Sequence, residues 1–175
     1  MQRRITVKLG QGFSPQALQA QNGDAVFWEN IDDKEPHQPV STDANAKWSV
    51  AEVTPHNTSD LVALNTPSTV HYACKNHPTE TGTIVVAQGI VIAPGANPLF
   101  GATQIKKGQC VSWSNSSPDA HQPCPKTGDP WFTSPIASED ISSTISFDTA
   151  SATAIAYYCA LHPDKPEETG TITVS

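Results

Sequence analysis

The sequence predicts an all-β fold, arranged as two tandem β-sandwiches of about ninety residues each. Fifteen prolines and ten glycines, together with many Ser, Thr, Asn and Asp residues, divide the 175-residue chain into short segments rich in β-formers. One pattern of tryptophans, histidines and cysteines occurs twice. No segment has a convincing helical period, and only Pro15–Gln21 and Ile136–Ile141 are expected to form short turns of helix.

Ten short apolar runs are expected to form the strands, five in each half of the chain. In the first half these are Ile5–Leu9, Ala25–Asn30, Leu61–Leu64, Thr69–Ala73 and Thr83–Ala87. In the second half they are Ile90–Ala93, Cys110–Ser114, Thr144–Phe147, Ile155–Cys159 and Thr171–Val174. Alternation is clearest around the tryptophans, where Val26 and Trp28, like Val111 and Trp113, share one face of a strand.

The repeat has a nearly constant offset and divides the chain. Its matched pairs, all 83 to 85 residues apart, are Gly23/Gly108, Trp28/Trp113, His37/His121, Trp48/Trp131, Cys74/Cys159 and His77/His162. A repeat of this length predicts two domains, residues 1–87 and 88–175. The border near Ala87-Gln88-Gly89 leaves almost no linker, so we expect the two domains to be packed together.

The composition is acidic, with 17 Asp and Glu against 10 Lys and Arg, and the excess is shared between the halves. Binding to nucleic acid is disfavoured, because neutralising phosphates requires clustered basic residues. An acidic surface suits a basic redox partner, although it is also common in ordinary proteins. No apolar stretch approaches the ~20 residues of a membrane span. No signal peptide is visible, because Met-Gln-Arg-Arg leads directly into an expected strand, as in a processed mature chain or a cytosolic one.

Each half contains the spacing of a metal site. The segments CKNHPTETGTIVV from Cys74 and CALHPDKPEETGTITV from Cys159 each place a cysteine and a histidine on one tight loop. An upstream histidine, His37 or His121, must come from a neighbouring strand to close the site. Two imidazoles and one thiolate form the trigonal set of mononuclear blue-copper centres, which a weaker axial ligand completes.

Both halves resemble small cupredoxins of the plastocyanin and amicyanin type, and the resemblance covers essentially the whole chain. Amicyanin-like loops read Cys-x2-His-Pro-x-Met-x-Gly, and CKNHPTETG keeps the cysteine, histidine, proline and glycine at that spacing. The resemblance implies Greek-key cupredoxin sandwiches, copper and one-electron transfer. It also implies the equatorial ligands, which are His37, Cys74 and His77 in the first half and His121, Cys159 and His162 in the second.

The axial methionine does not carry over, because the only methionine is Met1 and Glu80 stands in its position. The second loop is three residues longer. Alignment on Gly-Thr-Ile selects Glu168, alignment on the histidine selects Lys165, and Glu167 is a neighbouring possibility; Glu168 is favoured. A carboxylate favours Cu(II) and moves the geometry toward tetragonal, and the set of two His, one Cys and one Glu resembles that of the red-copper cupredoxin nitrosocyanin. Glu80 as an exposed loop acid is the alternative, and zinc is the alternative metal.

The remaining cysteines, Cys110 and Cys124, occur only in the second half, where the first has Ala25 and Val40. Their joint presence predicts a disulfide, and with it an oxidising compartment. Two separate small core residues are the alternative. His56 and His71 have no histidine counterparts and are expected to be surface or hydrogen-bonded histidines rather than ligands. The tryptophans are expected to pack rather than to conduct electrons.

The sequence as a whole predicts a periplasmic or secreted copper-binding electron carrier with two mononuclear sites. Its expected partner is a redox protein such as a cytochrome, and a homo-oligomer is compatible with the sequence. Two other functions stay open: copper storage or delivery, and enzyme-like nitric oxide or nitrite chemistry at an open copper position.

Overall fold

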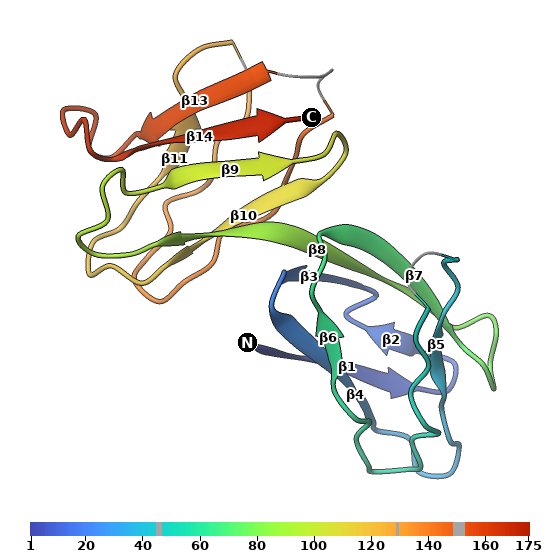
Figure 1. The fold of residues 1–175 in the computed structure, drawn as a ribbon. Coiled ribbons are helices and arrows are strands. Elements are labelled where there is room, and N and C mark those ends of the chain that lie inside the picture. The colour runs from blue at the N-terminus through green and yellow to red at the C-terminus, as the bar shows by residue number, and fades with distance from the viewer. Residues whose placement is uncertain (45–46, 129, 149–152) are drawn as a thin grey trace. The chain divides into compact units, whose positions relative to one another are not determined.

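The computed structural model describes residues 1–44, 47–128, 130–148 and 153–175 (Figure 1). The described residues form strands, turns and bends, with no helix, so the all-β prediction is confirmed. They accordingly contain no helix that is long and apolar enough to cross a membrane. The chain divides into two compact units, Met1–Val86 and Ala87–Ser175.

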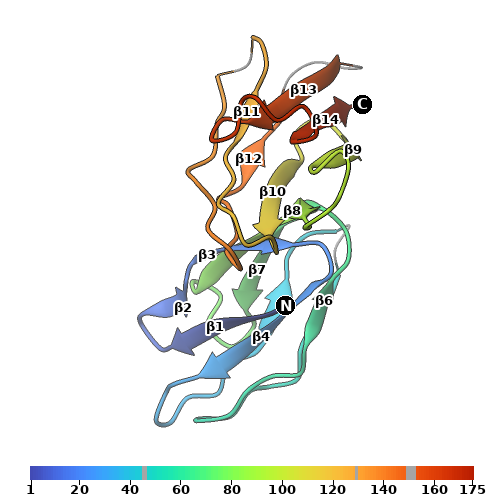
Figure 2. The same cartoon turned by 90° about the vertical axis from the view of Figure 1, so that its left-hand side faces the viewer.

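The first unit is built from two sheets, as expected of a β-sandwich. One sheet has the order β2-β1-β4-β6, with β1 and β4 parallel and side by side in Figure 2. Its strands are β1 (Gln2–Lys8), β2 (Gly12–Ser14), β4 (Asp24–Asn30) and β6 (Val62–Leu64). In the other sheet, β7 pairs with β5 on one side and with β8 on the other, and β3 pairs with β8. These strands are β3 (Ala17–Gln21), β5 (Pro39–Ser41), β7 (Ser68–Cys74) and β8 (Thr81–Ile92).

The second unit repeats this plan with the end of β8 and the strands that follow. Residues 88–92 of β8 run parallel to β10, and β12 pairs with the other edge of β10. The second sheet has the order β11-β13-β14-β9. The strands are β9 (Gly101–Ile105), β10 (Cys110–Asn115), β11 (Pro123–Pro125), β12 (Ile145–Ser146), β13 (Thr153–Cys159) and β14 (Thr169–Val174).

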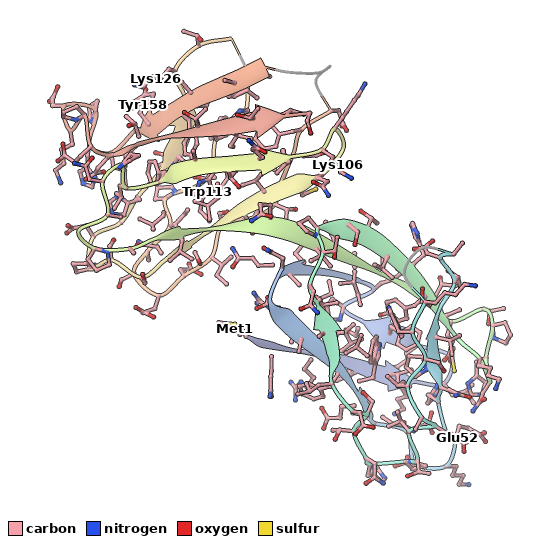
Figure 3. All side chains as sticks on the ribbon, viewed as in Figure 1. Met1, Glu52, Lys106, Trp113, Lys126 and Tyr158 are labelled. Atoms are coloured by element: carbon pink, nitrogen blue, oxygen red, sulfur yellow. The ribbon has the colours of Figure 1, made fainter. Side chains whose placement is uncertain are left out.

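Each unit has its own core, centred on the tryptophan of the middle strand. Trp28 and Trp113 are fully buried, and Figure 3 labels Trp113 on β10. Each tryptophan packs against a second one, Trp48 or Trp131, and edge-on against a buried tyrosine. The predicted shared face of Val26 and Trp28 is confirmed by the strict burial alternation of β4. The tryptophans are therefore part of the packing, as the sequence indicated.

The glycine of the Gly-Thr-Ile segment is required by close approach to a ring. Gly82 on β8 faces Tyr72 on β7, and a Cβ atom at Gly82 would overlap the Tyr72 ring. Gly170 faces Tyr157 in the same way, and a Cβ there would also lie 2.8 Å from the Gly101 carbonyl oxygen. The tyrosine lies two residues before the cysteine of each loop, so this contact fixes the strand that delivers the cysteine.

Both expected helical turns are wrong. Residues Ala17–Gln21 form β3, in which Leu18 and Ala20 are buried and the residues between them point outward. Ile136 is fully buried and forms an isolated β-bridge with His121. In both places pairing with a neighbouring strand and burial of alternate residues outweigh local helix propensity.

Candidate metal centres

The loop between β7 and β8 brings three of the predicted ligands together. Cys74 is the last residue of β7, and Glu80 directly precedes β8. The Cys74 amide donates to the Glu80 carbonyl oxygen at 2.9 Å, and the Glu80 amide donates to the His77 carbonyl oxygen at 2.9 Å. These two hydrogen bonds close the loop, so that its cysteine, histidine and glutamate lie around one point. The second unit repeats the first bond, from Cys159 to Glu168 at 3.0 Å.

The remaining histidine comes from the segment between β4 and β5. His37 exchanges two backbone hydrogen bonds with Val53, of 3.0 and 2.8 Å, and His121 does the same with Ile136, at 3.1 and 2.8 Å. The Lys75 amide of the cysteine loop donates to Gln38, the neighbour of His37, at 2.8 Å. The histidine is therefore held by backbone bonds on both sides.

In the first centre the four side chains His37, Cys74, His77 and Glu80 converge, with one donor atom from each within 4.8 Å of the others. His37 Nδ1 lies 3.1 Å from Glu80 Oε2 and 3.6 Å from Cys74 Sγ. His77 Nδ1 lies 3.6 Å from Cys74 Sγ and 3.7 Å from Glu80 Oε2. A four-coordinate ion with bonds of about 2.0–2.3 Å separates its donor atoms by roughly 3.3–3.8 Å. Three of the four distances lie in this range and the His37–Glu80 distance is slightly shorter, so the four atoms are close enough together to share one metal ion.

The second centre brings together His121, Cys159, His162 and Glu168 in the same way. Glu168 Oε2 lies 3.1 Å from His121 Nδ1 and 2.8 Å from His162 Nδ1. Cys159 Sγ lies 3.5 Å from His162 Nδ1 and accepts the Gln122 amide at 3.4 Å. Of the three alternatives in the longer loop, Glu168 is the one beside both histidines, whereas Glu167 is exposed and Lys165 is paired with Glu168 itself.

Burial of these side chains agrees with metal binding. Both cysteines are fully buried, His37 and His121 are buried, and Glu80 and Glu168 are at most 7 % exposed. Glu80 Oε2 lies close to His37 Nδ1, yet the geometry forms no hydrogen bond, and Glu80 Oε2 and His37 Nε2 have no hydrogen-bond partner among the described residues. Unpartnered buried polar atoms are costly, and a bound cation would remove that cost for the carboxylate. The donor set therefore fits a metal ion, and the reading of Glu80 as an exposed loop acid is wrong.

One histidine of each centre reaches the surface. The side chains of His77 and His162 are 21 % and 26 % exposed, whereas those of His37 and His121 are 0 % and 4 % exposed. A cleft of about 460 Å³ adjoins the first centre, between the residues that follow β1 and the cysteine loop. Its lining includes Gly10, Phe13, His77 and Glu80.

The groups behind the ligands differ between the centres. Glu80 Oε1 accepts a hydrogen bond from the backbone amide of Gly10 at 3.3 Å. Glu168 Oε1 instead accepts a hydrogen bond from the side-chain ammonium of Lys165 at 3.0 Å. His37 Nε2 lies 3.7 Å from the Asp32 carboxylate, whereas His121 Nε2 lies 2.9 Å from the Ser117 hydroxyl. The first centre therefore has an extra anion, and the second an extra cation.

These contacts shift pKa values in the metal-free protein. Burial alone would raise the pKa of Glu168, but hydrogen bonds from Lys165 and His162 outweigh it and hold that pKa below its usual range. The same hydrogen bond raises the pKa of Lys165. The Leu9 amide, at 2.7 Å, and other backbone amides hold the pKa of Asp32 well below its ordinary value. Burial raises the pKa of the Cys159 thiol.

Two asparagines at the end of the tryptophan strands shape the histidine segments, and neither was singled out from the sequence. Asn30 is fully buried; its Nδ2 donates to the carbonyls of Glu35 and Val53 at 2.8 and 2.9 Å, and its Oδ1 accepts the Asp32 amide. Asn115 repeats these bonds with Asp119, Ile136 and Ser117. The signal was present, because Trp-x-Asn recurs at the offset of the other repeated residues.

The predicted disulfide is not formed. Cys110 and Cys124 are both free thiols, and they lie in different sheets. Cys110 pairs with Ser146 on β12, while Cys124 pairs with Tyr158 on β13. The two cysteines are therefore separate, as in the alternative, but both are half-buried and neither belongs to the core. They give no support to an oxidising compartment. His56 and His71 are exposed, as predicted, beside Asp33 and Asp43.

Comparison with known proteins gives matches among solved structures only. No protein-family model matches the chain, and no curated protein does. A purple cupredoxin from Nitrosopumilus maritimus matches at 22 % identity over 48 % of this chain and 98 % of its own, with a TM-score of 0.43. Two mutants of amicyanin match at 21 % and 20 % identity over 47 % and 49 % of this chain and 79 % and 81 % of theirs, each with a TM-score of 0.43. These neighbours are cupredoxins. Each covers about half of the chain.

Proposed function

We propose that the protein is a copper-binding electron carrier with two mononuclear centres. One observation carries the proposal: in each unit, two histidine Nδ1 atoms, a cysteine Sγ and a glutamate carboxylate oxygen converge on one point. Thiolate and imidazole ligands suit copper, and sites of this kind bind Cu(II) more tightly than Zn(II). Bound copper would supply a one-electron couple at each centre.

The chain's own residues would supply rigidity, insulation from water and a path for the electron. In the folded chain, backbone hydrogen bonds fix the cysteine loop and the histidine segment without help from a metal ion, so the ligand positions need change little between oxidation states. The cysteine, the glutamate and one histidine are buried, which excludes water. Of the four candidate histidine ligands, His77 and His162 have the more exposed side chains, so each offers the edge through which an electron would pass.

The expected partner is a redox protein, such as a cytochrome, that docks over the exposed histidine edge. The net charge of −7 would favour a basic docking face. A periplasmic or secreted location stays a proposal that rests on the resemblance to cupredoxins, now without the disulfide as support.

The proposal is tested by the absorption and EPR spectra and the reduction potential of the copper-loaded protein beside its Glu80→Met and Glu168→Met variants. A softer axial ligand should raise the potential of the altered centre and move its thiolate charge-transfer band to longer wavelength. Glu29→Met removes a carboxylate elsewhere in the first unit and should leave both unchanged. Unchanged spectra in the first two variants would refute axial glutamates, and tight zinc binding without a copper couple would refute the electron carrier.

A second candidate, small-molecule chemistry at copper, is favoured by the cleft beside Glu80 and His77. In that case nitrite or nitric oxide would perturb the spectrum of the first centre, because a small ligand could reach it. No perturbation at saturating ligand would remove this candidate.

A further inference from the structure

The two centres have the same four types of ligand, but the charges next to those ligands differ in two independent places. The first place is the glutamate oxygen that does not face the histidines. A neutral amide, that of Gly10, contacts it in the first centre, and the Lys165 ammonium contacts it in the second. The second place is the Nε2 atom of the buried histidine, which faces the Asp32 carboxylate in the first centre and the Ser117 hydroxyl in the second.

Both differences act in the same direction on a bound metal ion. Cu(II) carries one more positive charge than Cu(I), so a nearby anion favours Cu(II) and a nearby cation favours Cu(I). Asp32 would also strengthen His37 as a donor, while Lys165 would draw electron density from the Glu168 carboxylate and weaken it as a donor. The surroundings of the first centre therefore stabilise the oxidised ion, and those of the second stabilise the reduced ion.

Resting on the proposed function, we propose that the two centres are electrostatically unequal, with the second at the higher reduction potential, and that Asp32 and Lys165 are the positioning residues that set this order. Each couple is Cu(II) + e⁻ → Cu(I), with the electron supplied by a redox protein. In a singly reduced molecule at equilibrium the electron would reside mainly at the second centre. With a tenfold difference, about ten molecules in eleven would hold it there, and a tenfold difference is about 59 mV for one electron.

Other charges near Lys165 do not reverse this order. Asp119 and Glu167 both interact with Lys165, but both side chains are exposed and screened by water. The Lys165 ammonium is also partly exposed, yet it contacts a carboxylate that is buried. Its charge is therefore the one that is coupled directly to a ligand.

The test is a spectroelectrochemical titration of the full copper-loaded chain, with Cys74→Ala and Cys159→Ala variants to assign each wave to its centre. We expect the second centre to be reduced first. Lys165→Met should shift the Cu(II)/Cu(I) preference of the second centre at least tenfold toward Cu(II), whereas Lys165→Arg should preserve the wild-type value. Asp32→Asn should shift the first centre in the opposite direction.

The matched control is Lys126→Met, because Lys126 lines the same surface hollow as Lys165 without contacting a candidate ligand, and it should change the preference less than threefold. Figure 3 labels Lys126 beside Tyr158, next to β13. Equal potentials, a higher potential at the first centre, or equal shifts in Lys165→Met and Lys126→Met would overturn the inference.

Zinc affinity separates failure of this inference from failure of the proposed function. Zn(II) has no redox couple but senses the same charges, so Lys165→Met should tighten Zn(II) binding at the second centre and Asp32→Asn should weaken it at the first. Absence of a reversible copper couple at both centres would refute the electron carrier. Zinc affinities that neither variant changes would refute the electrostatic inequality itself.

Discussion

Replacing Asn30 by Asp should loosen the segment that carries His37 while leaving the strands in place. The substitution keeps an acceptor for the Asp32 amide but removes the Nδ2 donor, so a carboxylate oxygen would face the carbonyls of Glu35 and Val53. Each lost hydrogen bond is worth about 0.5–1.5 kcal/mol, and the buried carboxylate adds a desolvation cost. The free energy of local opening of this segment should therefore fall by about 1–3 kcal/mol, and further through the desolvation cost.

The assay is native-state hydrogen exchange of the metal-free protein. His37 and Val53 donate to each other's carbonyls, so both amides report the opening of this segment. A change of 1–3 kcal/mol corresponds to exchange that is about 5- to 150-fold faster. Asn115→Asp should have the same effect on the His121 and Ile136 amides.

The control is Asn57→Asp, which places the same charge on an exposed residue whose side chain bonds only locally, to Thr54 and Pro55. It should change exchange at His37 less than twofold. If Asn30→Asp also stays within twofold, the buried asparagine does not hold the segment, and the reasoning is refuted.

Three further predictions concern the stability of the metal-free protein, measured by urea unfolding. Gly82→Ala should cost about 1–3 kcal/mol of unfolding free energy, because its Cβ would overlap the Tyr72 ring. Gly170→Ala should cost at least as much, because the Gly101 carbonyl oxygen also obstructs a Cβ there. An unchanged unfolding free energy in Gly82→Ala would contradict the close approach. Tyr157→Phe should cost about 1–3 kcal/mol, because Trp113 Nε1 loses the hydroxyl that accepts its hydrogen bond at 3.2 Å. Tyr72→Phe should cost less, because the Tyr72 hydroxyl has no hydrogen-bond partner among the described residues, and equal costs would refute this. The pKa of Asp32 is lower in the folded than in the unfolded protein, so ionised Asp32 stabilises the fold above pH ~4, and this stabilisation is lost as the pH falls through the folded pKa. The free energy of unfolding of Asp32→Asn should therefore fall less steeply with acid below pH ~4 than that of the wild type. Identical dependence of the unfolding free energy on pH would contradict this.

Spacing in the sequence was sufficient to locate the residues of both centres. The Cys-x2-His-Pro loops and the two upstream histidines predicted eight side chains, and the structure gathers these eight in two groups of four. Their binding of metal stays a prediction. Local spacing worked because a hydrogen-bonded loop between two paired strands fixes three ligands within one short segment.

Interactions between distant residues were harder to predict. Lys165 entered the sequence argument as an alternative ligand, whereas in the structure it is an ion-pair partner of Glu168. Residues 17–21 have helix-forming residues but pair as a strand, because alternate burial of Leu18 and Ala20 is decided by the sheet beside them. Joint occurrence of Cys110 and Cys124 indicated a bond, yet the two residues lie in different sheets.

The short cysteine loops also affect how the protein would acquire its metal. Three of the four donor side chains of the first centre come from the seven residues Cys74 to Glu80, and those of the second from the ten residues Cys159 to Glu168. Each segment carries three ligands close together even in the unfolded chain, so metal would bind to the unfolded protein and not to the native protein alone. A ligand stabilises a fold only by the difference between those two affinities. Metal could thus bind before folding is complete. His37 or His121 comes from a distant segment and would then be the last ligand to coordinate.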